Sequence, residues 1–224
     1  MNAIKKLYTI GILLVVSLQL TGCSAVQVRD RTYLQAVEIT QPKDTGEYRI
    51  TLHDFTQPEK TTAAVGTNLD EALEKAAVPL GKSLFLGHLE LIEYSDGKYT
   101  SELSKWMETY RLSPACKVLL LTEEETQDQH DTLQLAQQLR LAEEKGLMPE
   151  TDLLTILRER SSAGQTALLP AWTTEGFSTA IVHENGEKTA LTPSATAGLC
   201  WLRGENHPDC IALSETESYT VTYL

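Results

Sequence analysis

The feature that most limits how this chain can fold is an apolar stretch near its N-terminus. Residues 7–20 form a run of mostly apolar side chains, preceded by Lys5 and Lys6 and by no acidic residue. A helix that crosses a bilayer needs about 20 apolar residues, so this run is too short to span and has the form of the central region of a secretory signal peptide. The folded part must therefore be built from the residues that follow.

The apolar run ends in Leu20-Thr21-Gly22-Cys23, which has the form of a bacterial lipobox. In such a sequence the small residues let a signal peptidase approach the backbone, and the cysteine thiol takes a diacylglyceryl group. We therefore expect residues 1–22 to be a lipoprotein signal peptide and Cys23 to be the lipidated residue. Two or three acyl chains on one cysteine anchor a protein stably without a spanning helix, because each buried methylene contributes about 0.8 kcal/mol.

The charge balance narrows the choice of partners. The chain has 31 acidic and 19 basic side chains, and its formal net charge is −12. Removal of residues 1–22, which contain two lysines and no acid, leaves 202 residues and takes the charge to −14. Without a basic surplus to displace counterions, nucleic acid is not an expected partner. Attraction of a basic patch to an anionic leaflet is excluded on the same ground, so attachment to a membrane must be apolar.

The first half of the mature sequence has the pattern of a mixed α/β unit. Residues 33–40 and 48–55 alternate apolar and polar side chains around a turn-rich segment, which predicts an antiparallel hairpin. Asn68 and Glu71 have the spacing of a helix cap, and the helix that follows is expected to stop at Pro79-Leu80-Gly81. Further along, the periodicity predicts a strand over residues 83–94, a helix over 99–110 and a buried strand over 116–122.

The second half begins with two predicted helices, over residues 131–145 and from Thr151 onward, which we expect to form a bridge between two parts of the chain. Leu153, Leu154, Ile156 and Leu157 are expected to form the apolar face of the second helix. Asn185-Gly186 separates two alternating segments and predicts a hairpin over residues 177–191. A helix over residues 195–201 and strands over 210–213 and 219–224 complete the prediction.

These elements predict an α+β fold of two small mixed α/β domains. Residues 23–165 would form an N-terminal mixed α/β domain that includes the helical bridge. Residues 166–224 would form a smaller, β-rich second domain.

Residues that could carry chemistry are few. Gly81-Lys82-Ser83 resembles the end of a phosphate-binding loop, but Ala76 stands where the pattern requires a glycine. The five histidines have no partner at a spacing that prearranges a metal site. We therefore expect no metal, no cofactor and no catalytic residue, and hence no enzyme. His88 interrupts an apolar segment beside Gly87, and we interpret it as a buried structural imidazole.

Three further cysteines contain no C-x-x-C pair, which argues against both a disulfide framework and a zinc site. Cys116 opens an apolar run and is expected to be a core residue. Cys200 and Cys210 stand ten positions apart across Gly204 and Pro208. They either pack singly or bridge a hairpin, and the spacing leaves both alternatives open.

Five segments, taken in order, resemble the Ger(x)C (GerAC-like) family of spore germination lipoproteins. They are the lipobox, Asp30-Arg31 before a strand, residues 84–88 before an apolar strand, Leu169-Pro170 before a hairpin, and residues 198–205. The resemblance implies a non-enzymatic, lipid-anchored C-type subunit of a nutrient germinant receptor, on the outer face of the spore inner membrane. Its partners would be integral-membrane A-type and B-type subunits, and Cys23 alone takes a role from the family.

The resemblance has two departures. Residues 24–29 stand where family members carry Trp-Asp-Arg directly after the lipidated cysteine, and the family's third, C-terminal domain is expected to be absent because the sequence stops at Leu224. Two other classes of lipoprotein compete with this interpretation. One is a substrate-binding lipoprotein of a transporter, which needs a ligand cleft between two lobes. The other is a lipid-anchored hydrolase, which lacks its motifs here.

Overall fold

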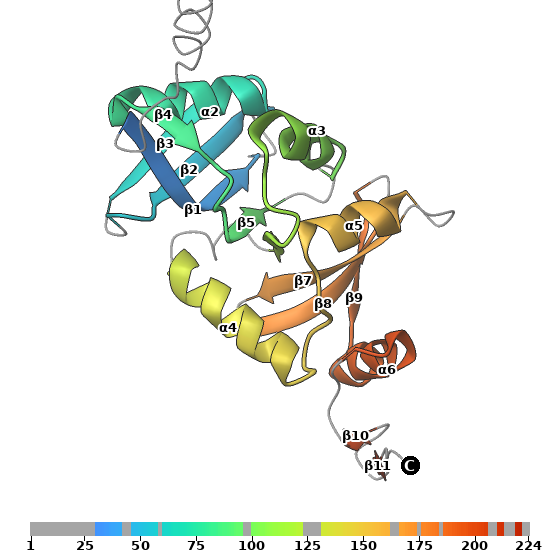
Figure 1. Ribbon diagram of the computed structural model, residues 1–224. Coiled ribbons are helices and arrows are strands. Elements are labelled where there is room, and N and C mark those ends of the chain that lie inside the picture. Colours follow the sequence, from blue (N-terminus) through green and yellow to red (C-terminus); the bar gives the residue numbers. More distant parts are fainter. Residues whose placement is uncertain are drawn as a thin grey trace, which may run out of the picture. The chain divides into compact units, whose positions relative to one another are not determined.

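The structure is a computed structural model that describes residues 30–41, 46–57, 60–95, 100–122, 131–161, 166–173, 176–183, 186–205, 210–212 and 218–220. The chain from Thr32 onward forms one compact unit. Within the described residues this unit contains a nine-stranded mixed sheet with helices packed on both of its faces (Figure 1). The predicted α+β class is confirmed.

The strands of the large sheet lie in the order β3-β2-β1-β5-β6-β7-β8-β9, and β4 also pairs with β1. Their bounds are β1 Arg31–Thr40, β2 Tyr48–Asp54, β3 Thr61–Gly66, β4 Ser83–Phe85, β5 Leu91–Tyr94, β6 Lys117–Leu121, β7 Ala167–Thr173, β8 Gly176–Val182 and β9 Lys188–Leu191. The central pairs β1–β5, β5–β6 and β6–β7 are parallel, and the flanking pairs are antiparallel hairpins. A separate antiparallel pair is formed by β10 (Cys210–Ala212) and β11 (Ser218–Thr220).

The described helices cover the two faces of the large sheet. Their bounds are α2 Leu69–Ala77, α3 Thr100–Tyr110, α4 Thr132–Glu144, α5 Leu153–Arg160 and α6 Pro193–Arg203, with a short 3-10 turn, Val78–Leu80, after α2. The larger apolar core joins α2, α3 and α5 to one face and contains the fully buried Trp106. The smaller core joins α4 to the opposite face, where it packs on Ala36, Leu91 and Leu119.

The helices expected to bridge two domains instead form a crossover within one sheet. The segment that contains α4 and α5 leaves β6 and returns as β7, which pairs with β6 through Leu120–Ala171 and Leu121–Trp172. Parallel neighbours need such a connection, because a tight turn cannot join them. The expected boundary after residue 165 therefore separates strands of one continuous sheet. In α5, Leu153 and Ile156 are buried as expected, but Leu154 is half exposed.

Two strands were not predicted, and one predicted strand is interrupted. The unpredicted strands are β3, an edge strand of small residues, and β7, which contains Pro170. The segment 83–94 forms β4 and β5 with a turn between them, in which the N–H of Leu89 donates to the carbonyl of Leu86. Both short strands pair with β1, so the break lets the chain follow one partner in two steps.

Helix α6 is longer than expected and is tied to the rest of the unit by ion pairs. Thr192 caps its first turn by accepting from the N–H of Ala195, and Gly204 ends it in the left-handed conformation at a φ of 69°. Arg203 forms ion pairs with Glu159 at 2.8 Å and with Glu205 at 2.5 Å. Because Glu159 belongs to α5, these contacts hold α6 against the helix on the larger core.

Candidate functional site

Cys23, the predicted lipidation site, lies outside the described residues. The described chain begins at Asp30, and β1 begins at Arg31, eight positions after Cys23. No helix in the described part of the chain has the length and apolar character needed to cross a bilayer. Within the same residues, no group of three His, Cys, Asp or Glu side chains is arranged to hold a metal ion.

The start of β1 carries a group of aromatic side chains that we call the aromatic patch, composed of Tyr33, Phe55, Phe85 and His88. The ring centroids of Phe85 lie 5.3 Å from those of both Tyr33 and His88, and the Tyr33 and His88 centroids lie 6.1 Å apart. Phe55 directly follows β2, and its N–H donates to the carbonyl of Tyr33 at 2.8 Å. Three neighbouring segments of chain therefore contribute to one patch.

The patch lies on the sheet face opposite the larger core. Leu34 is fully buried in that core, and Tyr33 precedes it in the strand, so the two side chains point to opposite faces. Leu34 and Asp54 are the last paired residues of β1 and β2 at this end, and the backbone hydrogen bond from Phe55 to Tyr33 keeps Phe55 next to the patch. Phe55 is 54% exposed.

His88 corrects a prediction made from the sequence. It was expected to be buried, but it is exposed in the turn between β4 and β5, with its ring against Tyr33 and Phe85. The neighbouring Leu86 and Leu89 supply the buried side chains of this turn. Alternation along a single strand would have buried the imidazole, and the break in the strand turns it outward instead.

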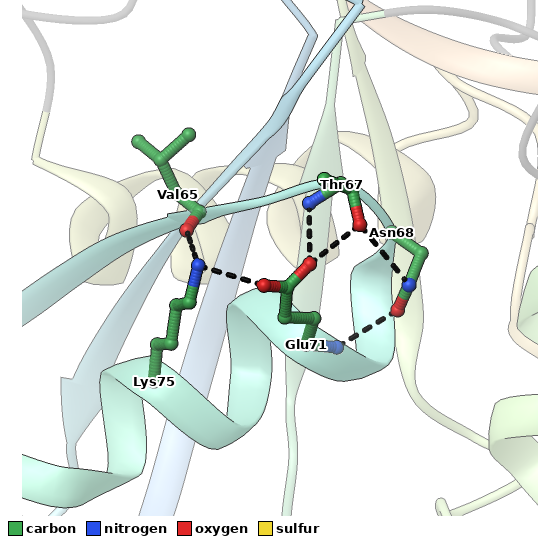
Figure 2. Close-up of polar contacts among 5 residues, drawn as sticks. All are labelled: Val65, Thr67, Asn68, Glu71 and Lys75. Atoms are coloured by element: carbon green, nitrogen blue, oxygen red, sulfur yellow. Dashed lines mark hydrogen bonds and ion pairs between the residues drawn. The ribbon is translucent and has the colours of Figure 1, made fainter.

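A second candidate region is polar and lies at the start of α2. The Asn68 side chain accepts from the N–H of Glu71 at 2.9 Å, and the Glu71 carboxylate accepts from both the N–H and the hydroxyl of Thr67 (Figure 2). Lys75 reaches the other Glu71 oxygen at 2.8 Å and donates to the carbonyl of Val65 (Figure 2). Hydrogen bonding by Lys75 and then by Thr67 lowers the pKa of Glu71 to about 2. This network caps the helix, as Asn68 and Glu71 predicted.

Beside this cap, a hollow of about 310 Å³ is lined by residues of α2 and α3, including Asp70, Lys105 and Trp106. Lys105 forms an ion pair with Asp70, and the Tyr110 hydroxyl donates to the other Asp70 oxygen at 3.2 Å. The hydrogen bond from Lys105 lowers the pKa of Asp70, whereas burial and the Asp70 charge raise the pKa of Tyr110 to about 12. The three groups satisfy one another, so this hollow is a clasp between two helices.

A third region is an apolar hollow of about 300 Å³ between the end of α4, β8, β9 and the start of α6. Its walls include Met148, Phe177 and Thr196, and the Thr179 hydroxyl lies 3.7 Å from the Met148 sulfur. A hollow of this size is at the small end of ligand pockets. The described walls supply no charged side chain that would orient a polar ligand.

Helix α4 also forms a buried ion pair with β6. Lys117 Nζ lies 2.7 Å from Glu143 Oε2, and the N–H of Thr151 donates to Glu143 Oε1 at 3.2 Å. The Glu143 side chain is only 5% exposed. Burial raises the pKa of Glu143, and the hydrogen bond from Lys117 opposes this effect.

The described cysteine thiols are poor nucleophiles. Cys116 is buried, as predicted, and burial raises the pKa of its thiol to about 12. Cys200 is also buried, and its thiol pKa is raised to about 11 for the same reason. Cys200 is a free thiol in the structure, and the side chain of Cys210, its possible partner by spacing, lies outside the part that the structure describes. Thiols with such pKa values are protonated near neutral pH and resist oxidation and alkylation.

Comparison with protein-family models, with curated proteins and with solved structures finds no match to this chain. The sequence pointed to Cys23 and His88 as residues of interest, and it did not identify the other members of the aromatic patch. Tyr33 and Phe55 could have been linked through the predicted hairpin, since both lie at its open end. Phe85 joins them only because β4 pairs with β1.

Proposed function

We propose that this chain is a lipid-anchored C-type subunit of a spore nutrient germinant receptor. In this role it acts in receptor assembly or signalling by contact with integral-membrane A-type and B-type subunits, and it catalyses no reaction. The observation that carries the proposal is the lipobox ending at Cys23, followed by segments that resemble the Ger(x)C family in the same order along an α+β unit.

The places of these segments in the fold support the proposal. Residues 84–88 end β4 and make the turn before β5, and Pro170 lies within β7, just before the two residue pairs that join β7 to β6. Residues 198–205 form the second half of α6 and its cap at Gly204. These three segments lie at or beside places where the backbone changes direction or pairing, where a shared fold restricts sequence.

The chemistry of the described side chains also favours action by contact. Lysines hold the carboxylate of Asp70, which pairs with Lys105 in the α2–α3 clasp, and that of Glu143 near the end of α4, which pairs with Lys117. A transporter's substrate-binding lipoprotein would bind its ligand in a cleft between two lobes. The hollow beside α6 is instead a small apolar space within a single compact unit, so this alternative is the weaker one.

The test combines lipidation with co-purification in a spore-forming host. The wild-type chain is expected to incorporate a labelled fatty acid and to bring down multipass membrane proteins from detergent-solubilised spore membranes. Cys23→Ala is expected to lose the label, whereas the matched control Cys200→Ala keeps it. A wild-type chain recovered without acyl groups, or one that turns over a substrate when purified, would exclude the proposed function.

A further inference from the structure

We propose that the aromatic patch seats the compact unit directly on the bilayer surface, with Phe55 inserting at the level of the lipid headgroups. The inference rests on the proposed lipid anchor at Cys23 and deepens it, because it assigns the unit a fixed orientation rather than a free tether. The site consists of Phe55, Tyr33, Phe85 and the exposed His88.

The number of residues between Cys23 and β1 limits how far the patch can lie from a lipid anchor at Cys23. Cys23 and Arg31 are eight residues apart, and an extended chain spans at most about 3.3–3.6 Å per residue, so roughly 28 Å separates them at full stretch. Tyr33 lies two residues further on, at the start of β1. In the sheet order, β9 is the edge strand on the side away from β1 and β2, and α6 contacts its neighbour β8.

The chemistry of the patch suits a membrane interface. Aromatic rings with a polar edge or tip are enriched where headgroups meet the hydrocarbon, and Tyr33 and His88 have this character. Phe55 adds a ring that is more than half exposed to water and belongs to neither of the two core clusters. Burying such a ring is favourable in proportion to the apolar area removed from water.

The charges around the patch differ from those of the whole chain. The sequence segments that form this end contain three basic residues, Arg31, Lys60 and Lys82, and four acidic ones, Asp30, Asp54, Glu59 and Glu90. The Asp54 carboxylate accepts from the N–H and the hydroxyl of Thr56, both at 2.7 Å. The chain as a whole has 31 acidic and 19 basic side chains, an excess of twelve, whereas four acids against three bases leave an excess of one here, so this end carries little of the charge that would repel an anionic leaflet.

The experiment measures the depth of a reporter beside Phe55. The lipidated full chain carries Cys210→Ser and Gln57→Cys, and a fluorophore is attached to the new thiol, since Gln57 is exposed and Cys116 and Cys200 are buried. The protein is reconstituted into vesicles of phosphatidylcholine with a minority of phosphatidylglycerol. We expect a lipid-embedded quencher to quench the reporter and an aqueous quencher to be excluded.

Variants separate docking from anchoring. Phe55→Ser is expected to reduce quenching by the lipid-embedded quencher about fivefold or more while leaving the vesicle-bound fraction unchanged, since the acyl chains remain. Phe55→Trp is expected to keep the quenching. Leu202→Ser is the matched control, because it removes an exposed apolar side chain, 74% exposed, from α6. A thermal melt confirms that each variant is folded.

The possible outcomes are distinct. A wild-type chain that is isolated from its host without acyl groups contradicts the proposed function. A chain that binds through its acyl groups while the reporter stays fully open to the aqueous quencher contradicts the docking inference alone. Protection of the reporter only after the integral subunits are added would assign the patch to a protein partner, and this too overturns docking on lipid.

Discussion

Replacement of Lys117 by methionine is expected to destabilise the fold more than any other single loss of a charge considered in this unit. The substitution leaves the Glu143 carboxylate with 5% of its side chain exposed and without the ammonium group that lies 2.7 Å away. The N–H of Thr151 remains as a partner at 3.2 Å. A buried carboxylate that loses its cation must either remain charged at a high desolvation cost or take up a proton.

The magnitude follows from the burial of the pair. Removing one partner of a buried ion pair typically costs 3–5 kcal/mol, and we expect about 3 kcal/mol here because the Thr151 hydrogen bond persists. For a domain of this size, such a loss lowers the melting temperature by roughly 6–12 °C. The assay is urea unfolding of the chain from residue 24 onward, which contains the whole compact unit that begins at Thr32.

The loss of unfolding free energy caused by Lys117→Met should depend on pH in a defined direction. Burial raises the pKa of Glu143 above its ordinary value of 4.5, so the folded state binds more protons than the unfolded state between these two pKa values. The contribution of Glu143 to stability therefore falls as the pH rises through this window. Loss of Lys117 raises the folded pKa further, because Lys117 lowers it in the wild type. The penalty of Lys117→Met should thus shrink between about pH 7 and about pH 5.

Two controls make this test specific. Lys82→Met removes an exposed lysine and should change the free energy of unfolding by less than about 0.5 kcal/mol. The double substitution Lys117→Met with Glu143→Leu removes both charges and should recover most of the loss. A penalty for Lys117→Met that is below about 1 kcal/mol at pH 7, or that is the same at pH 5, would contradict a buried, coupled pair.

Three further predictions concern single groups. Asn68→Ala should lower the stability of the unit by about 1 kcal/mol in a thermal or urea melt, because it removes the acceptor that caps α2; no change would contradict the cap. Cys116 and Cys200 should resist alkylation in the native protein near neutral pH and react in denaturant, as peptide mass spectrometry would detect, since burial raises both thiol pKa values. Asp70→Asn should lower the pKa of Tyr110 from about 12 but leave it above its ordinary value, because burial of the phenol remains. Ultraviolet titration of the phenol measures this shift, and an unchanged pKa would contradict an effect of Asp70 on Tyr110.

Elements with strong local signals could be predicted from the sequence. The hairpin of β1 and β2 follows from alternation, and the start of α2 follows from Asn68 and Glu71, whose side chains satisfy the first turn. The helix predicted over residues 99–110 is likewise present as α3, and its Trp106 is buried in the core. In each case the residues that define the element lie within a few positions of one another.

The elements that were missed depend on distant partners. The strand β3 has only small side chains on its exposed positions, and it forms because β2 offers a full ladder from Thr61 to Gly66. Pro170 argues against a central strand, yet β7 lies between β6 and β8. The proline is tolerated on the β6 side because the residues that pair with β6 are Ala171 and Trp172, which both have an N–H. Neither fact is available from local periodicity.

The candidate site was only partly predictable for the same reason. Cys23 belongs to a motif that can be identified within a few residues. The aromatic patch is instead assembled by strand register, which brings Tyr33, Phe55 and Phe85 together from three separate segments. His88 was singled out correctly as unusual, but its exposure depends on the break between β4 and β5, which apolar periodicity does not reveal.

The seam between β6 and β7 has a consequence for how the unit responds to temperature. Among the described residues two pairs connect these strands, together with hydrogen bonds from Thr122 to the carbonyl of Trp172, whereas β7 and β8 share seven pairs, so the larger core that extends beneath both halves of the sheet is a main source of their cohesion. Apolar cohesion weakens on cooling, while backbone ladders are less affected. Cold is therefore the condition under which we expect the three C-terminal strands of the sheet to part from the rest as a block.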